Sequence, residues 1–190
     1  GNLHRWVGTQ PPVAVTGGQD IFTPAIQIPQ TDFVFEVIAT ASDWSAANQG
    51  LGGQFVTTPA NRGWMLRIRA GAVEVISSTD GGTTVGSAVS LPVGAAGLVN
   101  GEESYFRLGW DSTANTATLH LGSPSPNLDY VDEYRLVGTF TGLASPLLNT
   151  VTALHLGSLV RSGVAVGQGT AATGFDGSIR FARLTVGGAV

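Results

Sequence analysis

Alternation of apolar and polar residues is the dominant pattern of this chain. Between residues 31 and 40, Phe33, Phe35, Val37 and Ala39 occupy every second position, so they fall on one face of an extended segment. A period of two indicates a β-strand, because successive side chains of an extended chain point to opposite sides. The other face of this segment is also partly apolar. We therefore predict that it is a central strand of a sheet.

The same alternation predicts two hairpins and a core. Residues 63–69 turn into 72–77, and residues 104–111 turn into 116–121. In a last strand, 177–186, the alternation changes phase, and a bulge near Ala182-Arg183 would restore it. On the apolar phase of these strands we expect the core residues Trp64, Phe106, Leu108, Trp110, Leu119 and Phe181.

Many short strands separated by turn residues, with no amphipathic segment of helical length, predict an all-β fold. Strands without intervening helices pair antiparallel, which favours a two-sheet antiparallel sandwich over a barrel. Residues 1–22, with a Pro11-Pro12 pair, are expected to form an N-terminal arm or linker. Residues 23–190 are expected to form the sandwich domain.

Composition excludes several chemistries. The chain has 190 residues, 27 of them glycine, and it has no cysteine; its nine basic residues are all arginine. Thiol catalysis, disulfides and lysine Schiff bases are therefore excluded. A net charge of −4 argues against nucleic acid as a partner, because a nucleic-acid binder needs a basic face. No apolar run is long enough to predict membrane insertion.

A series of short motifs carries a family resemblance. The motifs are Asp43-Trp44 with Gln49, then 62–68, 78–81, 105–111 with 115–118, 155–158 and 175–179. In this order they resemble the laminin-G/concanavalin A-like jelly-roll domains, in particular those of minor tail proteins and other virion proteins of phages that infect actinobacteria. The resemblance covers residues 23–187 and implies a two-sheet jelly-roll sandwich of the concanavalin A-like type.

The resemblance also implies a function. It indicates a non-catalytic module of a phage tail or capsid, located in the extracellular virion, that mediates structural attachment or binds host-surface glycans. Its expected partners are other virion proteins, with self-association into a homo-oligomer or a larger assembly. The alternatives are a glycoside hydrolase of the sandwich type and a purely structural decoration domain, because one fold supports many functions.

Carbohydrate binding needs an aromatic platform beside polar groups, since the apolar face of a sugar stacks on an aromatic ring while its hydroxyls need hydrogen-bond partners. Trp44, at the end of a predicted strand, is the first candidate for this platform. Asp43, Asn48 and Arg62 would supply polar groups, and Tyr130 is a second aromatic candidate. The alternative for Trp44 is a loop residue that packs over the edge of the sandwich.

No catalytic residue is predicted. The dense acidic segment is 129–133, but sandwich glucanases related to this fold carry acidic residues at three alternating positions, and here Val131 stands at the middle one. His120 and His155 lie in predicted strands without a nucleophile elbow.

No metal or other cofactor is predicted either. Asp111, Asn115 and Asp176 are conceivable calcium ligands, but their spacing is not that of an EF-hand loop.

Overall fold

The computed structural model describes most of the predicted strands. Main chain and side chains are described for residues 31–46, 49–55, 63–80, 91–124, 134–143, 154–157 and 175–187. For Arg62 and for the short strands at 3–6, 13–15, 21–22, 26–27, 85–87 and 151–152, only the backbone is described.

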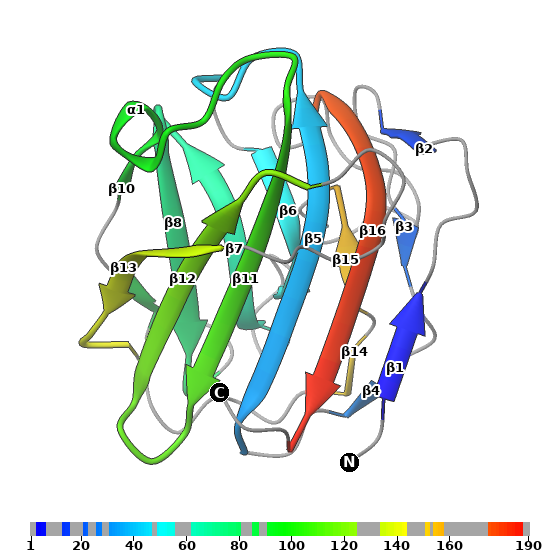
Figure 1. Ribbon diagram of the computed structural model, residues 1–190. Coiled ribbons are helices and arrows are strands. Elements are labelled where there is room, and N and C mark those ends of the chain that lie inside the picture. Colours follow the sequence, from blue (N-terminus) through cyan, green and yellow to red (C-terminus); the bar gives the residue numbers. More distant parts are fainter. Residues whose placement is uncertain are drawn as a thin grey trace.

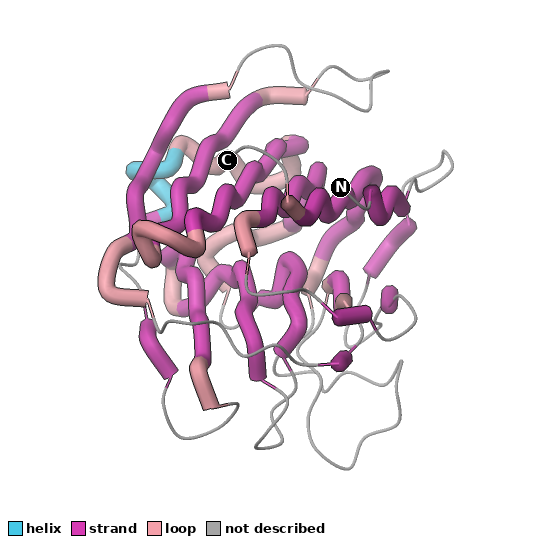
Figure 2. Tube along the Cα trace, turned by 90° about the horizontal axis from the view of Figure 1, so that it is seen from below, coloured by secondary structure: helices cyan, strands magenta, loops and turns pink. Residues whose placement is uncertain are grey.

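Within these residues the chain forms two seven-stranded antiparallel sheets that lie face to face as two layers (Figures 1 and 2). Sheet A has the strand order β1 (Leu3–Trp6), β16 (Gly177–Val186), β5 (Phe33–Ala41), β11 (Glu103–Asp111), β12 (Thr116–Gly122) and β13 (Arg135–Phe140), with β2 (Val13–Val15) also paired to β16. Sheet B has the order β10 (Leu91–Pro92), β8 (Ala72–Ser78), β7 (Arg62–Arg69), β6 (Gln49–Phe55), β15 (His155–Leu156) and β3 (Ile21–Phe22), with β9 (Val85–Ser87) paired to β8. The all-β, two-sheet antiparallel prediction is confirmed.

Two smaller elements complete the described fold. Strands β4 (Ile26–Gln27) and β14 (Val151–Thr152) pair with each other. The four-residue helix α1 (Val93–Ala96) lies at one edge of the two layers, next to β10 (Figure 2). Among the described residues, no helix has the length and apolar character needed to cross a membrane.

The prediction of a central strand at 33–41 is confirmed, because β5 lies between β16 and β11 in sheet A. Its inward side chains Phe33, Phe35 and Val37 are fully buried. Trp64 of sheet B lies 4.8 Å from Phe33 and 5.3 Å from Phe35, ring centroid to ring centroid. Aromatic side chains from the two layers therefore meet directly in the middle of the sandwich.

A glycine of β6 makes room for this packing. A Cβ atom added at Gly52 would collide with the ring of Phe35, which reaches across from sheet A. Gly52 therefore allows the two sheets to approach closely at this point.

All six predicted core residues are buried, but they fall into two clusters. Trp64, Phe106, Leu108, Trp110 and Leu119 are buried in the cluster between the sheets. The remaining predicted core residue, Phe181, is buried on the other side of sheet A, where it packs against Ile38 and Tyr105.

The position of the bulge explains this difference. The register of β16 against β5 shifts between Ile179 and Phe181, before the predicted position at Ala182-Arg183. Ile179, Ala182 and Leu184 therefore face the core, and Phe181 faces outward.

Candidate functional site on the outer face of sheet A

The Asp43-Trp44 loop, the first sugar site that the sequence suggests, has no exposed aromatic ring. The indole of Trp44 is only 1% exposed and packs at 5.4 Å from the ring of Phe106 and 5.9 Å from that of Phe175. Its Nε1 donates a hydrogen bond to the carbonyl oxygen of Val99 at 3.0 Å. The ring therefore has both an apolar environment and a partner for its one donor.

The polar groups around Trp44 bind one another. Asp43 Oδ1 accepts hydrogen bonds from the Ser45 backbone N–H at 2.8 Å and from Ser45 Oγ at 2.6 Å, and these bonds lower the pKa of Asp43. The Trp44 backbone N–H donates to Asn100 Oδ1 at 2.8 Å, and Gln49 Nε2 donates to the Asp43 carbonyl at 2.6 Å. The bonds from Trp44 to Asn100 and to Val99 join the loop that follows β5 to the segment that follows α1.

The expectation of an exposed indole platform at Trp44 is therefore corrected, because burial leaves no face of the ring for a sugar. The alternative of a loop residue that packs at the edge of the sandwich describes the observed position. Asn48 and Tyr130 lie outside the described residues, as does the side chain of Arg62.

The acidic segment 129–133 also lies outside the described residues. Of the conceivable calcium ligands, Asp111 Oδ1 accepts from the backbone N–H groups of Thr113 and Ala114, and Asp176 Oδ2 accepts from Ser42 Oγ. No group of three or more histidine or acidic residues among the described residues is placed to hold a metal ion.

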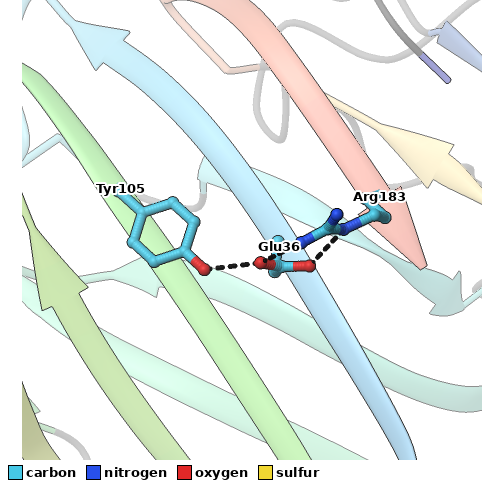
Figure 3. Close-up of polar contacts among 3 residues, drawn as sticks. All are labelled: Glu36, Tyr105 and Arg183. Carbon is cyan, nitrogen blue, oxygen red and sulfur yellow. Dashed lines mark hydrogen bonds and ion pairs between the residues drawn. The ribbon is translucent and has the colours of Figure 1, made fainter. Parts of the chain in front are cut away.

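Sheet A has a second face, turned away from sheet B, and we call it the outer face. At its centre Glu36 of β5 lies between Tyr105 of β11 and Arg183 of β16 (Figure 3). The Tyr105 hydroxyl donates to Glu36 Oε1 at 2.6 Å. Arg183 donates from Nε to Oε2 at 2.5 Å and from Nη2 to Oε1 at 2.8 Å. The Arg183 guanidinium therefore contacts both oxygens of the Glu36 carboxylate.

Burial and the Glu36 carboxylate together define the protonation states of this network. Burial of Tyr105, followed by its bond to Glu36, raises the pKa of Tyr105 far above its usual value, so the hydroxyl remains a donor. The bonds to Glu36 raise the pKa of Arg183 as well. The three side chains are thus fixed as donor, acceptor and donor across three strands.

Four neighbouring side chains of the outer face form what we call the tyrosine patch: Tyr105, Arg107, His120 and Tyr134. The Tyr134 ring lies 6.0 Å from the Tyr105 ring and 5.2 Å from the His120 ring, which it meets edge-on. The guanidinium carbon of Arg107 lies 5.7 Å from the centroid of the Tyr134 ring. Tyr134 itself is 46% exposed. The patch therefore presents an aromatic ring that its neighbours orient and solvent still reaches.

His120 is the titratable group of the patch. Burial, and to a smaller extent the charge of Arg107, lower the pKa of His120, which favours the neutral imidazole. Its Nδ1 atom is buried and has no hydrogen-bond partner among the described residues. A buried polar atom without a partner is rare in folded proteins and is costly to maintain.

A shallow pocket of about 370 Å³ opens beside the patch. It is lined by Leu121, Gly122, Ser123, Tyr134 and Arg135, where β12 ends and β13 begins. Arg135 closes one side, because its Nη2 donates to the Ala96 carbonyl of α1 at 2.7 Å. Tyr134 belongs to the patch and also lines the pocket, so the pocket adjoins the patch at this ring.

Sequence reasoning missed this site, although part of the signal was present. The alternation that places Phe106 and Leu108 inside also places Tyr105 and Arg107 outside. The same argument applied to residues 116–121 places His120 outside. The predicted hairpin of 104–111 with 116–121 puts Arg107 directly opposite His120. What the alternation does not contain is the pairing of β12 with β13, next to which the Tyr134 ring meets the His120 ring.

Comparison with solved structures identifies the class of fold. Domains LG4-5 of the mouse laminin α1 chain match with a TM-score of 0.59 and 13% identity over 92% of this chain and 40% of that one. A CBM40 of a Ruminococcus gnavus IT-sialidase, bound to α2,3 sialyllactose, matches with a TM-score of 0.54 and 18% identity over 90% of this chain and 91% of that one. The enzymatically active domain of tailspike protein 2 of bacteriophage CBA120 matches with a TM-score of 0.64 and 12% identity, over 98% of this chain and 28% of that one.

These matches show the fold: the chain is a jelly-roll β-sandwich, as the motif resemblance implied. The chain spans less than half of the laminin and tailspike structures, but it spans nearly the whole CBM40. No protein-family model and no curated protein sequence matches this chain. Because a fold supports unrelated functions, the function has to be argued from the site.

Proposed function

We propose that this chain is a glycan-binding jelly-roll module of a phage virion, and that the tyrosine patch is its sugar platform. The observation that carries this proposal is the ring of Tyr134. It is half exposed, it is oriented by contacts with Tyr105, Arg107 and His120, and it borders an open pocket.

An oriented and exposed aromatic ring is suited to a sugar. The apolar face of a pyranose stacks on such a ring, and a ring that is held in place before binding loses little conformational entropy. Polar groups nearby, among them Arg107 and Ser123, are then available to the sugar hydroxyls. In contrast, the Trp44 indole is buried, and its N–H donor is hydrogen-bonded within the protein.

The virion setting rests on similarity and composition. The tailspike match and the CBM40 match support a glycan-recognising part of a phage particle. The motif resemblance, together with arginine as the basic residue throughout a chain rich in Ala, Gly, Val and Thr, supports a phage with a GC-rich genome that infects actinobacteria. In this setting the module binds other virion proteins, either as a homo-oligomer or within a larger assembly, and is exposed outside the host cell.

We further propose that the module binds without catalysing hydrolysis. A glycosidase needs two carboxyl groups that flank the scissile bond. On the outer face of sheet A, Glu36 is engaged by Arg183 and Tyr105, and Glu103 by Arg180, whose Nε donates to Glu103 Oε1 at 2.8 Å. Both of these carboxylates are therefore directed at arginines.

Glycan binding is tested with the purified protein on an array of bacterial surface polysaccharides, followed by calorimetry on the ligands found. We expect Tyr134→Ala to weaken binding about fivefold or more, since ring stacking contributes roughly 1 kcal/mol. Val99→Ala is the matched control, because Val99 is 51% exposed and lies outside the patch. An unchanged affinity of Tyr134→Ala, or no glycan bound at all, would contradict the proposed site.

The other parts of the proposal have separate tests. Release of reducing ends from a bound polysaccharide would show hydrolysis and favour the glycoside hydrolase alternative. Mass spectrometry of purified phage particles checks the virion setting and gives the copy number. A protein present in particles that binds no glycan would instead have a structural attachment or decoration role.

A further inference from the structure

The register of sheet A places three charged side chains in one row of its outer face. Glu36 of β5 lies directly opposite Arg183 of β16 on one side and opposite Arg107 of β11 on the other. Arg183 donates to both oxygens of the Glu36 carboxylate, and the Tyr105 hydroxyl donates to one of them. The Glu36 carboxylate is therefore paired with Arg183. With two arginines and one glutamate, the row has one positive charge in excess.

Arg107 is the arginine of this row that does not pair with Glu36. Its guanidinium is half-buried and lies over the Tyr134 ring. It makes no hydrogen bond or ion pair with any other residue in the described part of the chain. A guanidinium has five N–H donors, in a planar fork that fits a carboxylate, sulfate or phosphate group.

Apart from Glu36, which Arg183 neutralises, the described neighbours His120 and Tyr105 add no negative charge beside Arg107. His120, directly opposite it on β12, is kept neutral because burial and the Arg107 charge lower the pKa of the imidazole. Tyr105 keeps its proton because burial and Glu36 raise the pKa of the phenol. Among the described residues, the side chains next to the Tyr134 ring thus carry a net positive charge, although the whole chain is negative at −4.

We infer that the tyrosine patch selects acidic glycans, with the anionic group of the sugar bound by Arg107 while a sugar ring lies against Tyr134. This inference rests on the proposed function, since it names the class of glycan that the same site takes. Arg107 is the residue that determines specificity, and Tyr134 supplies the affinity that acidic and neutral sugars share.

The test compares matched ligands by calorimetry. The probes are a uronic-acid trisaccharide, its carboxyl-reduced neutral counterpart and a sulfated trisaccharide, with free acetate and inorganic phosphate as anions without a sugar. We expect the acidic sugars to bind about tenfold or more tightly than the neutral one, as a charged hydrogen-bonded contact would give. This preference decreases as salt is added.

Variants assign the preference to one residue. Arg107→Gln is expected to abolish the difference between acidic and neutral sugars, with a smaller loss of affinity for the neutral one, because Arg107 also contacts the Tyr134 ring. Arg69→Gln is the control, because it makes the same change of charge on β7 of the other sheet, where the Arg69 side chain is 57% exposed. If Arg107→Gln does not fold, Arg107→Lys is used instead; it keeps the charge but lacks the fork, and we expect it to lose part of the preference.

Three results would overturn the inference and leave glycan binding standing. The first is equal affinity for the acidic and the carboxyl-reduced trisaccharide. The second is a loss in Arg107→Gln that is the same for both, which would mean that Arg107 only holds the Tyr134 ring. The third is binding of free acetate or phosphate as tight as that of the acidic sugars. Failure of every sugar to bind would instead remove the proposed function, and this inference with it.

Discussion

The Asp43-Trp44 loop and the tyrosine patch have similar residues but differ in what those residues contact. Each combines aromatic rings with charged or amide groups. In the loop, the Trp44 ring is buried and its donor is used, and Asp43 is bound by Ser45. In the patch, the Tyr134 ring is half exposed, and Arg107 has no acceptor among the described residues.

The difference shows that residue type does not identify a binding site in this fold. A ring that is buried and hydrogen-bonded within the chain stabilises the sandwich, whereas an exposed ring beside an unpaired donor has interactions left for a ligand. Each of the following predictions tests one side of this comparison.

The largest expected effect is on stability, from Trp44→Ala. Removal of a fully buried indole that contacts Phe106 and Phe175 should lower the free energy of unfolding by about 3–5 kcal/mol. The corresponding change in the patch, Tyr134→Ala, should cost no more than about 1 kcal/mol, because that ring is half exposed. Denaturant unfolding of the two variants measures both values. Equal losses would erase the distinction between the two regions.

A smaller loss of stability is expected from Glu36→Gln, which removes the charge that Arg183 and Tyr105 contact. We expect the free energy of unfolding to fall by about 1–3 kcal/mol, the range for hydrogen bonds to charged groups. Glu102→Gln is the matched control, since Glu102 is exposed in a turn. Denaturant unfolding of both variants measures their free energies of unfolding. A Glu36→Gln protein as stable as the control would show that the network contributes nothing to stability.

The smallest effect is a pH dependence from His120. Because the pKa of His120 is lowered in the folded protein, the unfolded chain binds the proton more readily. Stability should therefore fall as the pH drops from the unfolded pKa of about 6.5 toward the folded value. His120→Gln should lack this part of the pH profile. An NMR titration gives the folded pKa directly, and a value at or above that of the unfolded chain would contradict the prediction.

Local sequence was sufficient for the strands and most of the core. In 63–69 and 104–111 the period of two alone places Trp64 and Phe106 inside, because side-chain alternation is a property of any extended chain. Phe181 shows where this argument stops. One extra residue in β16 reverses the face of every later position, and the site of that bulge depends on the pairing with β5.

The sequence by itself therefore determined that this chain is an antiparallel β-sandwich, and which phase of each strand faces the core. Only the tertiary structure decided where a ligand would bind. Glu36 and Arg183 are 147 positions apart in the chain, and Glu36 and Tyr105 are 69 apart. The pairing of β16, β5 and β11 brings these three residues together. Because Glu36 pairs with Arg183, Arg107 has no ion-pair partner within the described residues. Burial of Trp44 likewise depends on Phe175 and Val99, both distant in sequence. Such contacts depend on strand order and register, which short-range alternation does not encode.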